Sequence, residues 1–488
     1  METSRLINTL KTFSKEEMKM FGKFLASPYY NSGKNCMPLF KQLQKFHPDF
    51  KSDRLAYEAL YKKLYPAKKF NKQVMWNLVS ATEKMTKEFL EQDALRKNKF
   101  IRTGLLLSEF GRRKLLNNYS HALGEMEKLL EKSGIDYDYF DNKGHLENYK
   151  QEYYHLTDKV RAMGDSKLRA SEYQILLFLR MTVGGLNDMK VLSGNYNYKF
   201  ELNIPLETAK NLDLKNIVDY AYRNNFEYAF LTEIYYHALM MLLDPNQSIH
   251  LDRVRDLYTE HSDKFTLSEK RNVMHWILNY CTSHTGFDEV KYRRIIFELN
   301  KVRLREGLVY YPENQIPKAN FQQILNAALA IGETVWAENF IKDYAQKLQP
   351  DIRNSVQNLA YALLYFKMKE FRKVLKSLNK IVFVNIDIQD KYFVRTLTAR
   401  SYYELNELEP LLSYINSSNR FLKINPSVTK SDRIYIHNFF KYIKKIVFIR
   451  EDNDLSNIGV VRNEIEKTRE ISNKNWLLEK LNELEKVK

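Results

Sequence analysis

Glycine and proline are scarce in this sequence. The 488 residues contain 15 glycines and 11 prolines, and together these make up roughly 5% of the chain, against about 12% in average proteins. Sandwiches, barrels and glycine-rich nucleotide folds need many chain-reversing residues, which glycine and proline supply. The composition therefore disfavours these folds and favours long helices joined by short connections.

Cysteine and long apolar runs are also lacking. Cys36 and Cys281 lie far apart in the sequence and belong to no Cys/His ligand cluster, so neither a disulfide framework nor a zinc site is indicated. The apolar runs are short pieces such as residues 175–179, well below the ~18 residues that span a bilayer. The opening residues lack the apolar core of a signal peptide. We therefore expect a soluble, cytoplasmic protein without membrane insertion.

The motifs that usually carry catalysis are missing as well. The sequence contains no phosphate-binding GxxxxGK[ST] loop, no GxGxxG, no GxSxG and no HExxH, each of which places specific groups around a reacting atom. The acidic stretch at 136–141 keeps only part of a calcium-loop pattern. We expect no metal, no cofactor and no enzymatic activity. An enzyme is the less favoured alternative, because catalytic groups can converge from distant helices.

Positive charge is concentrated at the N-terminus. The formal net charge is +17, and residues 1–120 alone hold 24 Lys and Arg against 11 Asp and Glu, whereas the other 368 residues hold 53 against 49. Such an excess favours polyanionic partners, namely nucleic acid, an acidic protein surface or anionic lipid. The alternative is a solvated lysine-rich face that serves solubility only.

Apolar residues recur at intervals of three and four along most of the chain, which predicts an all-α fold. Ser14 and Glu17 form a capping-box signature at the start of one helix, and Asn71 caps a longer helix that runs to about Arg96. We expect a basic N-terminal helical domain (1–100), a long-helix connecting region (101–200), a helical-repeat solenoid (201–425) and C-terminal capping helices (426–488).

Three successive segments in the last third of the chain share a repeated pattern. Small Ala328, Ala362 and Ala399 stand 34 and 37 residues apart. Each is followed three residues later by a larger apolar or aromatic residue and then by further apolar residues in a second helix. A small residue lets the paired helix approach closely, and the larger one fills the space between neighbouring pairs.

These spacings resemble the tetratricopeptide repeat, a helix-turn-helix unit of about 34 residues. The resemblance covers Asn320 to Ser418. The tryptophan of the first helix is absent, and Val335, Lys369 or Asn406 stands at the position of the turn glycine. The resemblance implies an antiparallel helix-hairpin solenoid.

In repeats of this kind the first helices line a groove that holds a protein segment. The resemblance therefore implies a non-enzymatic adaptor or scaffold with a protein partner. Its expected groove residues are Asn358, Tyr361, Tyr365, Arg395, Thr398 and Tyr402.

A second functional hypothesis concerns the segment LYKKLYPAKKFNKQVMW at 60–76. Its lysines can neutralise phosphates, and its aromatic residues can stack on exposed bases. The candidate nucleic-acid contacts are Lys62, Lys63, Lys68, Lys69, Lys72 and Trp76. The partner would be DNA or structured RNA, the ribosome included. The alternative interpretation is core aromatics flanked by solvated lysines.

Overall fold

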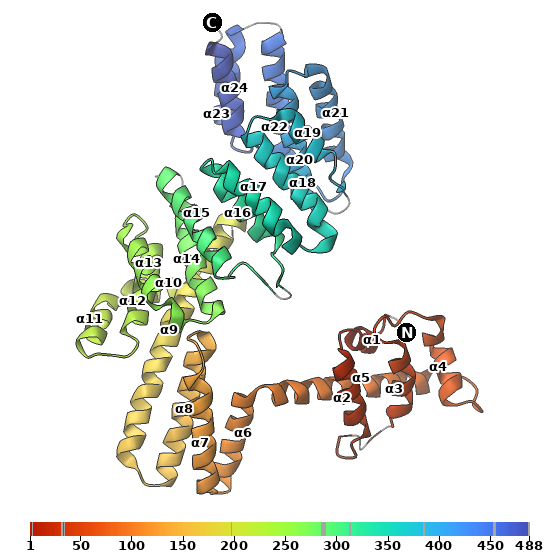
Figure 1. Ribbon diagram of the computed structural model, residues 1–488, viewed down its shortest axis with the longest axis vertical. Coiled ribbons are helices and arrows are strands. Elements are labelled where there is room, and N and C mark those ends of the chain that lie inside the picture. The colour runs from red at the N-terminus through yellow and green to blue at the C-terminus, as the bar shows by residue number, and fades with distance from the viewer. Residues whose placement is uncertain are drawn as a thin grey trace. The chain divides into compact units, whose positions relative to one another are not determined.

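The computed structural model describes residues 1, 3–30, 33, 35–196, 198–284, 289–311, 314–383, 386–451 and 455–486. Within these residues the protein is all-α, as predicted, and strand-like pairing is limited to single bridge residues such as Tyr311, which pairs with Gln315. The chain forms two compact units, residues 1–178 and 179–488, which divide inside helix α9 (Val160–Tyr196). Figure 1 shows the helices in chain order.

The first unit holds the helices that precede the division in α9. They are α1 (Arg5–Leu10), α2 (Lys15–Ala26), α3 (Met37–Leu43), α4 (Tyr57–Leu64), α5 (Lys72–Lys97), α6 (Lys99–Arg112), α7 (Leu116–Glu131) and α8 (Tyr137–Leu156).

Helices α1 to α5 pack around a cluster of phenylalanine rings. Phe89 of α5 lies 5.4 to 5.7 Å from the ring centroids of Phe13, Phe21 and Phe24. The helix starts follow the sequence signals. Ser14 Oγ accepts from the Glu17 N–H at 3.1 Å while the Glu17 carboxylate accepts from the Ser14 N–H at 2.8 Å, which confirms the capping box.

The second unit continues with helices of 8 to 22 residues. They are α10 (Ile204–Asn211), α11 (Leu214–Arg223), α12 (Ala229–Leu243), α13 (Ile249–His261), α14 (Leu267–His284), α15 (Glu289–Arg305), α16 (Lys318–Ala330), α17 (Thr334–Tyr344), α18 (Pro350–Lys367), α19 (Phe371–Leu378), α20 (Ile388–Glu404), α21 (Leu408–Ile424), α22 (Lys430–Glu451), α23 (Ile458–Lys467) and α24 (Lys474–Lys486). From α11 to α22 each helix packs against the next one, an arrangement compatible with a helical solenoid.

The hairpins α16–α17, α18–α19 and α20–α21 reverse the chain through a left-handed residue. Gly332, Lys369 and Asn406 have φ of 83°, 61° and 58°. The next N–H donates to the carbonyl five residues earlier, for example from Glu370 to Tyr365 at 2.9 Å. This Schellman bond satisfies a carbonyl that the end of the first helix leaves free. Because asparagine and lysine take two of these positions, the chain turns often with few glycines.

The hairpins repeat the same core around these turns. Buried apolar side chains stand seven residues before the left-handed residue, and five and nine residues after it. These nine residues are Leu325, Ala337, Ile341, Ala362, Val374, Leu378, Ala399, Leu411 and Ile415. Both steps from one left-handed residue to the next are 37 residues long, so the three hairpins form a tandem repeat.

The structure corrects the register of the first hairpin. The sequence pattern pairs Ala328 with Ala362 and Ala399, but Ala328 lies only four residues before the left-handed Gly332. Leu325 is the structural equivalent of the two alanines. The turn residue is therefore Gly332 and not Val335, and the first step of the repeat is 37 residues rather than 34.

Two earlier hairpins follow the same rule. Lys114 between α6 and α7 and Asn225 between α11 and α12 have φ of 55° and 54°. The following N–H groups of Leu115 and Phe226 donate to carbonyls five residues earlier, both at 2.9 Å. The buried residues at the equivalent offsets are Leu107, Tyr119, Leu123, Val218, Phe230 and Ile234.

Replacing Lys369 by glycine should stabilise the second unit. A left-handed backbone costs a lysine about 1 kcal/mol more than it costs glycine. We expect Lys369→Gly to raise the free energy of unfolding by up to about 1 kcal/mol, measured from urea unfolding. Lys376→Gly, in the last turn of α19, is the matched control and should lower it by up to about 1 kcal/mol. A loss of stability in Lys369→Gly would contradict this account of the turn.

Candidate functional site

A groove runs along the first helices of the three tandem hairpins. We call it the repeat groove, and it has a volume of about 660 Å³. It is lined by Asn326, Leu329, Ala330, Leu363, Phe366, Lys367, Lys369, Phe371, Leu397, Arg400, Glu404, Trp476, Glu479, Lys480 and Glu483. The last four come from the C-terminal helix α24.

The lining follows the repeat. In α16 it is formed by the residues six, three and two positions before the left-handed Gly332, which are Asn326, Leu329 and Ala330. In α18 the same offsets from Lys369 give the groove residues Leu363, Phe366 and Lys367. In α20 the offsets of six and two give Arg400 and Glu404. Equivalent positions of successive hairpins therefore face one continuous groove.

Arg400 lies in the wall of the groove between two aromatic rings. Its guanidinium is 4.2 Å from the ring centroid of Phe366 and 5.4 Å from that of Trp476. Nη1 donates to Asn473 Oδ1 at 3.0 Å, and the buried Nε has no hydrogen-bond partner among the described residues. Burial lowers the pKa of Arg400 to about 10, so the side chain is still a cation at neutral pH.

Lys480 and Glu404 fix α24 against α20. Lys480 Nζ lies 2.8 Å from Glu404 Oε1, and the two side chains are 5% and 18% exposed. The Trp476 indole N–H donates to the same oxygen at 2.9 Å. Burial acts to lower the pKa of Lys480, but Glu404 and Glu483 outweigh it and the pKa lies above its ordinary value. The ion pair is therefore intact at neutral pH and holds Trp476 in the groove wall.

The chemistry of the groove suits binding. Leu329, Leu363 and Phe366 supply an apolar floor, while the exposed Lys367 and Glu479 offer charges of both signs. Such a surface can bury apolar side chains of a ligand and pair its charged ones. Among the described residues no three His, Cys, Asp or Glu side chains are grouped so that they could hold a metal ion.

The sequence-predicted groove residues of α18 lie on another side of that helix. Tyr361 and Tyr365 stack at 5.9 Å, and Lys373 of α19 lies 5.3 Å from the Tyr365 ring centroid. Burial raises the pKa of Tyr361, and the nearby Lys342 of α17 opposes that rise. The Asn358 amide donates to the Asn354 carbonyl of its own helix at 2.8 Å. Tyr361 and Tyr365 therefore face the second helices α17 and α19, while the hydrogen bonds of Asn358 stay within α18.

The predicted residues of α20 also face inward. Arg395 donates to Ser418 Oγ at 3.2 Å and lies 4.0 Å from the Phe421 ring centroid, both on α21. Tyr402 packs against Tyr414 of α21 at 5.9 Å. Thr398 is buried and donates to a carbonyl of its own helix. All six predicted residues are described, and none of them lines the repeat groove.

The candidate nucleic-acid residues lie on the surface of the first unit. Lys62, Lys63, Lys68, Lys69 and Lys72 are all exposed. Trp76 is 46% exposed, and Lys72 Nζ lies 4.6 Å from its ring centroid.

The other aromatic residues of this segment belong to the core. Tyr61 is buried, and the half-buried Tyr65 and Phe70 pack on its ring at 4.9 and 5.3 Å. Of the four aromatic residues, Trp76 is therefore the one whose side chain can stack on a base.

Comparison with known proteins adds no relative. No protein-family model matches the chain, and no curated protein and no solved structure matches it significantly. None of the described helices combines the length and the apolar character needed to cross a membrane.

Removing the carboxylate of Glu404 should loosen α24. Truncation leaves Lys480 with Glu483 as its close partner but removes the acceptor of the Trp476 N–H and one carboxylate from Lys480, which together cost about 2 kcal/mol. We expect Glu404→Ala to lower the free energy of unfolding by about that amount and to speed amide hydrogen exchange in α24.

Glu479→Ala is the control for this variant. The Glu479 carboxylate is 62% exposed and lies 3.8 Å from Lys480 Nζ, so its loss should cost less than about 1 kcal/mol. Equal effects of the two substitutions would contradict the anchoring role of Glu404.

Proposed function

We propose that this protein is a non-enzymatic helical-repeat adaptor, similar to tetratricopeptide-repeat proteins, that binds a segment of a protein partner in the repeat groove. The observation that carries the proposal is the tandem placement of groove residues at fixed offsets from three left-handed turns. A repeated groove presents equivalent positions to successive residues of a bound chain, which is how solenoids hold extended segments.

The energetics of the groove favour a segment with apolar anchors. Its floor joins Leu329, Leu363 and the ring of Phe366, and burying one aliphatic or aromatic side chain of a ligand there contributes about 2 kcal/mol. The Lys480 charge already pairs with Glu404, and Arg400 is held in the groove wall by its hydrogen bond to the neutral Asn473 amide. Specificity then depends on the exposed rim, where Lys367 and Glu479 are available to pair with the partner.

A photo-crosslinking experiment tests the groove. Asn326 is exposed and lines the groove, so a photoreactive amino acid at 326 should crosslink a specific protein from the native host, with no dependence on nuclease treatment. The same amino acid at the exposed Lys376 of α19, outside the groove, should not crosslink it.

Direct binding then identifies the site. We expect Asn326→Trp to fill the groove and weaken binding of the purified partner at least tenfold, and Lys376→Trp to leave it unchanged, both by calorimetry. Equal affinities of the two correctly folded variants would contradict the proposal.

A second candidate function is nucleic-acid binding by α4, α5 and the segment between them. The observation that favours it is the exposure of five lysines, none of which forms an ion pair with a described carboxylate, beside the exposed Trp76. Cations without internal partners keep their full charge available for phosphates.

The salt dependence of binding tests this second function. We expect binding of single-stranded or structured RNA to weaken as salt rises, because each neutralised phosphate releases counterions. Changing Lys62, Lys63, Lys68 and Lys69 to glutamine should lower the slope of log K against log salt by roughly 3.

A charge-matched variant of the same domain is the control. Lys15, Lys19, Lys23 and Lys41 are also exposed, and changing them to glutamine removes the same charge elsewhere. Equal slopes for the two variants would show that the segment is not the contact site.

A further inference from the structure

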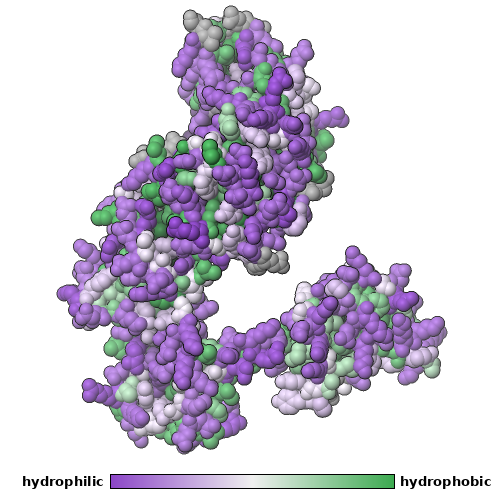
Figure 2. All heavy atoms as spheres, viewed as in Figure 1, coloured by the Kyte–Doolittle hydropathy of each residue, from purple (hydrophilic) through white to green (hydrophobic). Residues whose placement is uncertain are grey.

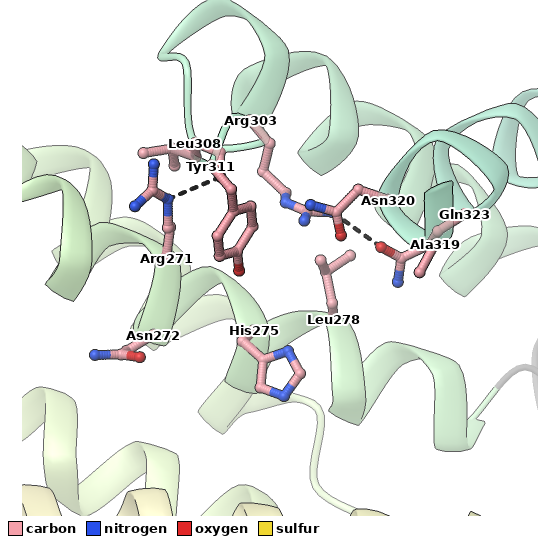
Figure 3. Close-up of a pocket in the computed structure, with 10 residues that line it drawn as sticks. All are labelled: Arg271, Asn272, His275, Leu278, Arg303, Leu308, Tyr311, Ala319, Asn320 and Gln323. Atoms are coloured by element: carbon pink, nitrogen blue, oxygen red, sulfur yellow. Dashed lines mark hydrogen bonds between the residues drawn. The ribbon is translucent and has the colours of Figure 1, made fainter. Parts of the chain in front are cut away.

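A second cavity, away from the repeat groove, is lined by α14, α15 and α16. It has a volume of about 530 Å³ and contains Arg271, His275, Arg303, Tyr311, Asn320 and Gln323 among its lining residues. Figure 3 shows the Tyr311 ring between the two arginines, with the Arg271 guanidinium 5.3 Å from its centroid on one side and Arg303 on the other. We call this cavity the arginine pocket.

Both guanidinium groups are held by neutral acceptors. Arg271 donates from Nε to the Leu308 carbonyl at 3.0 Å and from Nη2 to the Tyr310 carbonyl at 2.7 Å. Arg303 donates from Nη1 to Asn300 Oδ1 at 2.7 Å and to Gln323 Oε1 at 3.0 Å. Arg271 Nη1 and Arg303 Nε and Nη2 make no hydrogen bond to the described chain. The hydrogen bonds of the other guanidinium nitrogens hold these N–H groups in place, so they are available to donate to a ligand.

The two positive charges are not neutralised within the described residues, where no carboxylate pairs with Arg271 or Arg303. Two carboxylates lie close to other pocket residues: Asp188 is near His275, and Glu269 accepts from Asn272 at 3.0 Å. Glu269 already pairs with Arg180 through contacts of 2.8 to 3.2 Å. The pocket therefore holds two half-buried guanidinium groups that no described carboxylate pairs with, and such groups attract an anion.

Neutral donors complete the lining. Gln323 uses its oxygen for Arg303, so its amide N–H groups are free to donate. The Asn279 amide lies 3.0 Å from His275 Nε2, and because an amide nitrogen only donates, a neutral ring carries its proton on Nδ1. Burial lowers the pKa of His275, opposed by the nearby Asp188, so the ring is neutral at neutral pH. The Tyr311 hydroxyl adds a further donor.

We propose that the arginine pocket binds a phosphate monoester group. Two fixed guanidinium charges match the charge of a phosphate monoester near neutral pH, and their planar forks match phosphate oxygens. The cavity is larger than a phosphate alone and falls in the usual range for small-molecule sites. The phosphate is carried by a small phosphorylated metabolite or by a phosphorylated side chain of a protein, which share this chemistry.

Calorimetric titration of the full chain in a phosphate-free buffer tests the proposal. The probes are inorganic phosphate, glucose 6-phosphate, a phosphoserine peptide and acetate. We expect one molecule of a phosphate probe to bind per chain, and acetate to bind at least tenfold more weakly. Tighter binding of glucose 6-phosphate assigns a metabolite, and tighter binding of the peptide assigns a phosphorylated protein. No binding of any phosphate probe at millimolar concentration, or equal binding of acetate, overturns the proposal.

Substitutions locate the site. Arg303→Gln should weaken phosphate binding about tenfold or more, since a charge-assisted hydrogen bond is lost. Arg294→Gln is the control: Arg294 also lies on α15 but pairs with Glu298 and Glu333 outside the pocket, so it should leave binding unchanged. Equal binding by the two variants overturns the assignment.

A variant that supplies an internal anion guards against misfolding of Arg303→Gln. Gln323→Glu keeps the shape of the side chain and places a carboxylate beside Arg303, to which Gln323 Oε1 is already bonded at 3.0 Å. It should fold and should abolish phosphate binding, because the new carboxylate pairs with the Arg303 guanidinium in place of the phosphate. Gln349→Glu adds the same charge at an exposed position before α18 and should bind as the wild type does. Unimpaired binding by a folded Gln323→Glu variant overturns the proposal.

Discussion

The left-handed turn between the two helices of a hairpin is the constraint on which the repeated part of this structure depends. The hydrogen bond from Glu370 to Tyr365, and its counterparts at the other turns, end the first helix at a fixed residue. Since the second helix then starts at a fixed place, residues at constant offsets from the turn meet in the core. Ala362, Val374 and Leu378 are buried together for this reason, and so are their equivalents in each hairpin of this kind.

The same constraint produces the repeat groove. A helix has 3.6 residues per turn, so residues six, three and two positions before the turn lie within about 100° of one another, and the residue seven positions before it lies at the edge of this face, toward the paired helix. In α18 these are Leu363, Phe366 and Lys367, and Ala362 lies at the edge of their face, where it packs in the core of the hairpin. Helix α24 then adds Trp476 to the wall of the groove through the Lys480–Glu404 pair. Fold and candidate site therefore follow from one local geometry.

The sequence predicts much of the fold and less of the site. Helix starts at Ser14 and Asn71 are marked by local capping chemistry, which needs only a few adjacent residues. The side of α18 that forms the groove is harder to predict, because Tyr361 and Leu363 are both plausible lining residues until the turn is fixed. Aligning the hairpins on Gly332, Lys369 and Asn406 instead of on small residues would have given the correct register. The arginine pocket leaves no sequence signal, because Arg271, Arg303 and Gln323 come from three helices.

The repeat groove and the arginine pocket meet on one helix. In α16 the pocket residue Gln323 is followed three residues later by the groove residue Asn326, a separation of about 4.5 Å along the helix axis. A ligand that fixes the first half of α16 through Gln323 thus acts on the helix whose second half forms the groove. If occupancy of the pocket changes the affinity of the groove, linkage requires that a segment bound in the groove change the affinity of the pocket by the same factor. The two proposed sites have separate lining residues, and both include residues of α16, so this helix can couple them.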